Sequence, residues 1–207
     1  METKYLIKFA TIYSALFSPF YVPFWAFVWL FVFSYLSMSP IGYKLFVLGI
    51  VAAFTILIPR LTIEIFRWIN NWSHWQLSHR EHRHMPYIIT VASYVACIML
   101  FMHLNTATFM RGMILATLAA GLVCGTINIW WKVSTHMAGM GGLLGTIIAF
   151  SYLFYFNPIF PMSIALLMAG VMGTSRMMLR QHSLSQVLVG FAIGLIAALT
   201  CIMMAWV

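Results

Sequence analysis

Residues Lys132–Gly139 read Lys-Val-Ser-Thr-His-Met-Ala-Gly and open an apolar segment that continues to about Phe156. Residues Ser175–Gln186 read Ser-Arg-Met-Met-Leu-Arg-Gln-His-Ser-Leu-Ser-Gln and lie between two further apolar segments. Both stretches place histidine, basic and hydroxyl groups at the ends of segments of about 20 residues, the length that crosses a bilayer. Polar groups at such positions, in a chain with few other charges, indicate where function should be sought.

The composition of the chain excludes a soluble fold. Of its 207 residues, 63% are hydrophobic and only 7% are charged, whereas a soluble domain is about 25% charged. Such a chain cannot cover a surface that faces water, so an integral membrane protein is expected. The acidic residues are Glu2, Glu64 and Glu81, and Asp is absent. Paired-carboxylate hydrolysis and acidic metal cages are therefore excluded, and no metal or other cofactor is expected.

The apolar segments predict an all-α bundle of six to seven transmembrane helices in one domain, residues 1–207. The stretch Arg67–His84 is rich in Trp, His and Arg, and it is expected to form an interfacial helix before the third span. Pro19 and Pro23 predict that the first segment is kinked or only partly inserted. The expected spans are roughly Leu16–Leu36, Tyr43–Phe66, Pro86–His103, Phe109–Trp131, His136–Phe156, Pro161–Leu179 and Gln186–Trp206.

Glycine pairs at a spacing of four residues occur in the fourth, fifth and seventh expected spans. Small residues at this spacing let helix backbones approach closely inside a membrane. These three spans are therefore expected to form a tight inner bundle. The pairs are Gly121/Gly125, Gly141/Gly145 and Gly190/Gly194.

Polar clusters that are far apart in the sequence are expected to share one face of the membrane. If each span crosses once, the connections after the second, fourth and sixth spans all emerge on the same side. Their arginines suit phosphate oxygens, and two histidines can divide nucleophilic attack and proton transfer between them. The residues concerned are Arg80, Arg83, Lys132, Ser134, His136, Ser175, Arg176 and His182.

Gln186 follows His182 by four residues, so the two side chains are expected to lie on one face of a helix. The amide oxygen could then accept a hydrogen bond from the ring and orient it. The other histidines are expected at the headgroup level. A metal site built from His74, His79, His82 and His84 is disfavoured because no carboxylate or Cys stands at ligand spacing.

At these positions the chain resembles the type 2 phosphatidic acid phosphatase superfamily, whose members are integral membrane lipid phosphatases with the motifs KxxxxxxRP, PSGH and SRxxxxxHxxxD. Ser175–Gln186 matches the third motif in every spacing, with Gln in place of the final Asp. Val133–His136 retains the Ser and His of the second motif. Arg80–Pro86 provides an Arg before a Pro, with two residues inserted, and lacks the expected Lys. The resemblance covers about residues 78–194.

The resemblance implies hydrolysis of a lipid phosphate through a phosphohistidine intermediate, without a metal. By position, His182 would attack phosphorus, with Gln186 beside it, and His136 would protonate the leaving alcohol. The phosphoryl oxygens would be held by Arg176, Ser134 and Arg83, with Arg80 and Ser175 nearby. Independently of the resemblance, we infer that Lys132 replaces the Lys missing from the first motif.

A second interpretation is a non-catalytic descendant that binds a lipid phosphate or a membrane partner, and the neutral Gln186 favours it. In both cases the expected partners are a lipid phosphate and the bilayer, and no nucleic acid. The expected location is the bacterial inner membrane. The positive-inside rule places the polar face in the cytoplasm, whereas the bacterial relatives in this superfamily mostly act on the outer face. We expect an outward-facing site, because the basic residues that bind phosphate bias the charge count.

Overall fold

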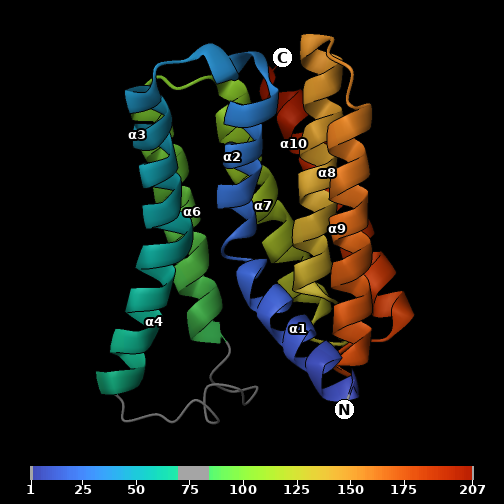
Figure 1. The fold of residues 1–207 in the computed structure, drawn as a ribbon. Coiled ribbons are helices and arrows are strands. Elements are labelled where there is room, and N and C mark those ends of the chain that lie inside the picture. The colour runs from blue at the N-terminus through green and yellow to red at the C-terminus, as the bar shows by residue number, and fades with distance from the viewer. Residues whose placement is uncertain (1, 70–83, 207) are drawn as a thin grey trace.

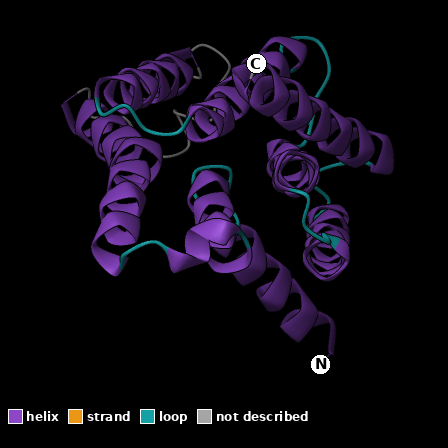
Figure 2. Cartoon of the chain, turned by 90° about the horizontal axis from the view of Figure 1, so that it is seen from above, coloured by secondary structure: helices purple, strands orange, loops and turns teal. Residues whose placement is uncertain are grey.

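The computed structural model describes residues 2–69 and 84–206, and every regular element in these residues is a helix (Figures 1 and 2). The prediction of an all-helical chain is confirmed for this part of the sequence. The elements in order are α1 (Glu2–Leu16), α2 (Val22–Phe33), the 3-10 helix η1 (Tyr35–Met38), α3 (Ile41–Ala52), the π-helix η2 (Ala53–Leu57), α4 (Ile58–Ile69), α6 (His84–His103), α7 (Thr108–Ile127), α8 (Thr135–Phe154), α9 (Ile159–Met178) and α10 (Leu184–Trp206).

Five helical stretches in the described residues are long and apolar enough to cross a membrane, which fits a multi-pass membrane protein. They correspond to the second, fourth, fifth, sixth and seventh expected spans. The third expected span lies on α6, a helix of 20 residues that contains the apolar stretch Ile88–His103. The stretches are Ile41–Ile69, Thr108–Ile127, Thr135–Phe154, Ile159–Met178 and Leu184–Trp206.

The first expected span, Leu16–Leu36, does not form one helix: it contains α2 and the start of η1, and α1 ends where it begins. α1 ends at Leu16, and α2 begins at Val22 with a proline in its first turn. At 12 residues α2 is too short to cross a bilayer. Proline lacks an N–H and fits only the first turn of a helix, so the kink expected from the prolines is a complete break. α1 itself was not expected; it runs obliquely across the lower end of the bundle in Figure 1.

The second expected span contains a π-helical turn. α3, η2 and α4 form one continuous helix from Ile41 to Ile69. A π-turn displaces the usual backbone hydrogen bonds, and here the hydroxyl of Ser93 on α6 donates to the carbonyl oxygen of Phe54. The helix continues three residues beyond the expected end of the span at Phe66. The rest of the predicted interfacial helix, residues 70–83, lies outside the described residues.

Glycines bring α8 and α10 into close contact, as expected for the fifth and seventh spans. A Cβ added at Gly194 would lie 1.8 Å from the carbonyl oxygen of Ala138, and one at Gly141 would lie 1.9 Å from that of Phe191. Only glycine allows this crossing. α7 also packs on α10, as expected for the fourth span, but at Gly112, where a Cβ would lie 3.0 Å from the carbonyl oxygen of Cys201. Gly121 takes no part in this packing, because a Cβ there would meet nothing within 4 Å.

Candidate active site

The connections 128–134 and 179–183 meet at one end of the bundle, which we call the polar end; it lies toward the bottom of Figure 1. A backbone hydrogen bond of 3.3 Å joins the first connection to the first turn of α10, from the N–H of Ser134 to the carbonyl oxygen of Gln186. Gly190 makes this approach possible, since a Cβ there would lie 2.4 Å from the carbonyl oxygen of Ser134. The two stretches in which sequence predicts the site therefore lie side by side.

Ser134 caps the amino terminus of α8. Its hydroxyl oxygen accepts a hydrogen bond of 3.4 Å from the N–H of Met137, and the residue is completely buried. Just before it, the N–H of Val133 donates to the side-chain oxygen of Asn128 at 2.8 Å. Serine is favoured at this position because its oxygen satisfies a helix N–H that has no backbone partner. The predicted phosphate ligand Ser134 is thus a buried helix cap.

His136 follows in the first turn of α8 and points toward α1. Its Nε2 lies 3.2 Å from the carbonyl oxygen of Ser14. A carbonyl oxygen only accepts, so Nε2 carries a proton and Nδ1 is the nitrogen available to a ligand. Arg176 and His182 lie close enough to His136 to interact with it electrostatically. The structure therefore brings together three residues that the sequence assigns to one site.

Arg176 lies in the last turn of α9 and is 8% exposed. One of its terminal nitrogens donates to the side-chain oxygen of Gln181, while its Nε has no partner among the described residues. Gln181 was not predicted as a site residue. The hydroxyl of the neighbouring Ser175 already donates to the carbonyl oxygen of Val171 at 2.7 Å. Arg176 thus keeps an unused donor, and Ser175 offers a ligand little.

The carboxyl end of α9 turns the chain toward His182. The N–H of Gln181 donates to the carbonyl oxygen of Arg176 at 3.1 Å, and the N–H of Arg180 donates to that of Met177 at 2.9 Å. This pair of bonds is a Schellman motif, which needs a left-handed residue after the helix. Arg180 takes that conformation, with a φ of 52°. The motif fixes the path of the five residues between Arg176 and His182.

Gln186 holds His182, as the spacing of four predicts. Nδ1 of His182 lies 3.3 Å from Oε1 of Gln186, and the N–H of Ser183 donates to the same oxygen at 3.1 Å. The second bond is one of the two hydrogen bonds of a capping box, here at the start of α10. It also identifies the atom facing the ring as oxygen, because a backbone N–H needs an acceptor. Nδ1 of His182 therefore carries the proton, and Nε2 has a free lone pair.

The surroundings of His182 favour its neutral form. Burial, with the positive charges of Lys132 and Arg176, lowers the pKa of His182 below its ordinary value, and the hydrogen bond to Gln186 partly opposes this shift. The amino-terminal ends of α8 and α10 are both here, each equivalent to roughly half a positive charge. Among the described side chains no carboxylate lies at this site, since Glu64 pairs with Arg67 at 2.8 Å. The site is suited to an anion.

The remaining predicted residues fall outside the described part of the chain. Arg80 and Arg83 lie in residues 70–83. So do His74, His79 and His82, three of the four histidines of the disfavoured metal site. Sequence reasoning missed Gln181 and the carbonyl of Ser14. The position of Gln181, directly before His182, could have marked it as a candidate. The carbonyl of Ser14 could not be found in this way, because every residue type has a backbone carbonyl.

Comparison with models of protein families, with curated proteins and with solved structures finds no match to this chain.

Proposed function

We propose that this protein is a membrane lipid-phosphate phosphatase that acts through a phosphohistidine intermediate. The observation that carries the proposal is His182. Its Nδ1 is engaged by Gln186, its Nε2 is free, and Lys132, Arg176 and His136 are its charged or titratable neighbours. A neutral imidazole with a fixed tautomer, surrounded by cations, is the arrangement that a nucleophile for a phosphate ester requires.

In the proposed reaction Nε2 of His182 attacks phosphorus, and the bond from phosphorus to the alcohol oxygen breaks. Protonated His136 gives its Nδ1 proton to that oxygen, and the alcohol leaves. A water then gives a proton to His136 and attacks phosphorus, the phosphorus–nitrogen bond breaks, and inorganic phosphate is released. Arg176, Lys132 and the amino-terminal ends of α8 and α10 stabilise charge on the phosphoryl oxygens.

A lipid substrate is proposed because the site lies at one end of helices that are long and apolar enough to cross a membrane. A phosphate at the headgroup level reaches the polar end while its chains stay among the helices. We place the protein in the bacterial inner membrane as part of the same proposal. A phosphomonoester or pyrophosphate of a lipid meets these requirements.

A second function is favoured by Gln186 alone. An uncharged partner orients His182 but does not stabilise the imidazolium that forms during transfer, and replacing Asp by Asn in a protease triad lowers the rate about 10⁴-fold. The alternative is a protein that binds a lipid phosphate, or a membrane partner, without turnover.

Release of inorganic phosphate from a short-chain phosphatidate by the purified protein tests the proposal. We expect turnover without added metal and a bell-shaped pH–rate profile, because the reaction needs His182 neutral and His136 protonated. Because the pKa of His182 is lowered, the acid limb of this profile should lie below the ordinary histidine value of about 6.5. Binding of phosphatidate with no phosphate release would favour the second function.

Replacing Gln186 by Glu is expected to keep or raise the rate. The carboxylate has the reach to accept the hydrogen bonds from His182 and Ser183, and its charge favours the imidazolium. The same charge should raise the pKa of His182 and move the acid limb of the pH–rate profile upward. Gln186→Leu, which loses both bonds, should lower kcat at least about tenfold. A well-folded Glu variant with little activity would show that the amide N–H₂ of Gln186 is needed.

A further inference from the structure

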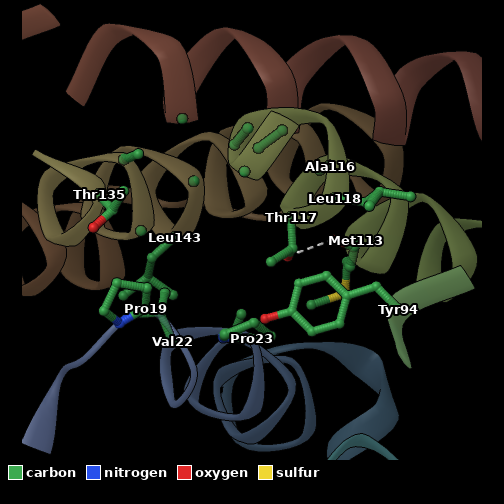
Figure 3. A pocket seen from close by; sticks show the side chains of 18 of the residues that line it. Pro19, Val22, Pro23, Tyr94, Met113, Ala116, Thr117, Leu118, Thr135 and Leu143 are labelled. Carbon is green, nitrogen blue, oxygen red and sulfur yellow. Dashed lines mark hydrogen bonds between the residues drawn. The ribbon is translucent and has the colours of Figure 1, made fainter. Parts of the chain in front are cut away.

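A cavity of about 250 Å³ lies between α2, α6, α7, α8 and α10, apart from the histidines. Its walls are largely apolar, with Phe27 and Leu143 among them and Tyr94 lining it from α6 (Figure 3). Thr135, the residue before His136, lines it from the amino-terminal end of α8 (Figure 3). A methylene group is about as large as a water molecule, whose share of liquid volume is about 30 Å³. The cavity therefore has room for on the order of eight methylenes.

The cavity reaches the surface of the bundle at α7. Gly121 and Leu122 line it, and both are exposed. A Cβ at Gly121 would meet nothing within 4 Å, so a side chain there would enter open space. This surface belongs to a helix long and apolar enough to cross a membrane. A hydrocarbon chain can therefore enter from the bilayer.

A cation contacts a residue that lies between two residues of the cavity lining. Phe20 and Val22 line it, and Tyr21 stands between them. Nη1 of Arg60, on α4, donates to the hydroxyl oxygen of Tyr21 at 2.6 Å, and its guanidinium lies 5.3 Å from the centre of the Tyr21 ring. Arg60 is exposed, and no described carboxylate pairs with it, since Glu64 pairs with Arg67.

Arg60 lies 19 residues (60 − 41) after the start of the helix Ile41–Ile69. At 1.5 Å per residue this is about 28 Å along the axis, close to the roughly 30 Å thickness of the hydrocarbon layer, so the guanidinium can reach the headgroup level. Tyr21 supplies one oxygen and one ring face. The other guanidinium donors have no hydrogen-bond partner in the described residues and match the oxygens of a phosphate.

We propose that the cavity and Arg60 form a binding site for an anionic glycerophospholipid, with one chain in the cavity and the phosphate on Arg60. The two sites use different contacts: the carbonyl oxygen of Ser14, in α1, accepts from His136, and the hydroxyl oxygen of Tyr21, just before α2, accepts from Arg60. The site does not depend on the proposed catalysis.

Binding of phosphatidylglycerol to the full-length protein in detergent tests the proposal. This lipid is a phosphodiester, so phosphomonoester hydrolysis does not consume it. We expect it to raise Tm and to bind at least about tenfold more tightly than phosphatidylcholine with the same chains. Arg60→Gln should lose this preference. Gly121→Leu, which fills the cavity, should weaken binding about tenfold or more, whereas Gly170→Leu should not, because Gly170 also faces open space but does not line the cavity.

Equal binding of the two lipids, or an Arg60→Gln protein that still prefers phosphatidylglycerol, would overturn the assignment of the headgroup. Unchanged binding by Gly121→Leu would overturn the assignment of the lipid chain to the cavity. Ala116→Leu is a second cavity-filling variant if the first does not fold. Displacement of the lipid by inorganic phosphate alone would show a free-phosphate site and contradict the proposal. His182→Ala should bind phosphatidylglycerol like the parent protein, so loss of catalysis leaves this test intact.

Discussion

Replacing His182 by alanine is expected to abolish phosphate release, with a fall in kcat of about 10⁴-fold or more. A methyl group has no lone pair to attack phosphorus, and no other described group occupies the place of Nε2. The fold should survive, because His182 lies in the connection 179–183 and its recorded side-chain hydrogen bond is to Gln186. The Ser183–Gln186 bond, which caps α10, remains in the variant.

The measurement is single-turnover phosphate release beside a thermal melt of each variant. His103→Ala is the matched control, because His103 is an exposed histidine in the last turn of α6 and lies away from the polar end. It should keep full activity. A His182→Ala protein that folds normally and turns over at the parent rate would exclude the phosphohistidine mechanism.

Replacing Gly194 by alanine is expected to destabilise the protein by about 3 kcal/mol or more. The added Cβ would lie 1.8 Å from the carbonyl oxygen of Ala138 and 2.8 Å from the backbone nitrogen of Gly142. Backbone atoms of a packed helix cannot move aside as the end of a flexible side chain can. α8 and α10 would have to separate, and the hydrogen bond between Ser134 and Gln186 would be lost with them.

Gly170→Ala provides the control for this substitution. Nothing lies within 4 Å of a Cβ at Gly170, so the change should stabilise α9 by roughly 0.5–1 kcal/mol through helix propensity. Denaturant or thermal unfolding in detergent compares the two variants. Equal stability of Gly194→Ala and the parent protein would mean that α8 and α10 do not cross at these glycines.

The helices that hold the polar end could be predicted from sequence, because a long apolar segment determines its own helical structure. About 20 apolar residues in a row specify a membrane helix with little help from the rest of the chain. The first segment differs because two prolines interrupt it. The effect of these prolines depends on how the helices on either side of them pack against the rest of the bundle. α1 escaped prediction because Lys4 and Lys8 interrupt its apolar residues, which bury only part of their surface.

Contacts of the candidate site were predictable only where they are local. His182 and Gln186 are one helical turn apart, so spacing alone brings them together. The contact of His136 with Ser14 joins residues 122 positions apart through a backbone carbonyl, which every residue type possesses. The cavity could not be predicted either, because Gly121 at the spacing of a packing motif instead faces open space.

The π-helical turn Ala53–Leu57 preserves the rotational phase of α4 about its own axis. A π-turn holds one residue more than an α-helical turn, and each residue of an α-helix turns the chain by about 100°. Deleting one residue from this turn would therefore leave a regular helix with Arg60 still facing Tyr21, whereas deleting one residue from the regular helix between Leu57 and Arg60 would swing Arg60 by about 100° away from Tyr21. The π-turn is thus a place where the chain can gain or lose one residue and keep the proposed lipid site.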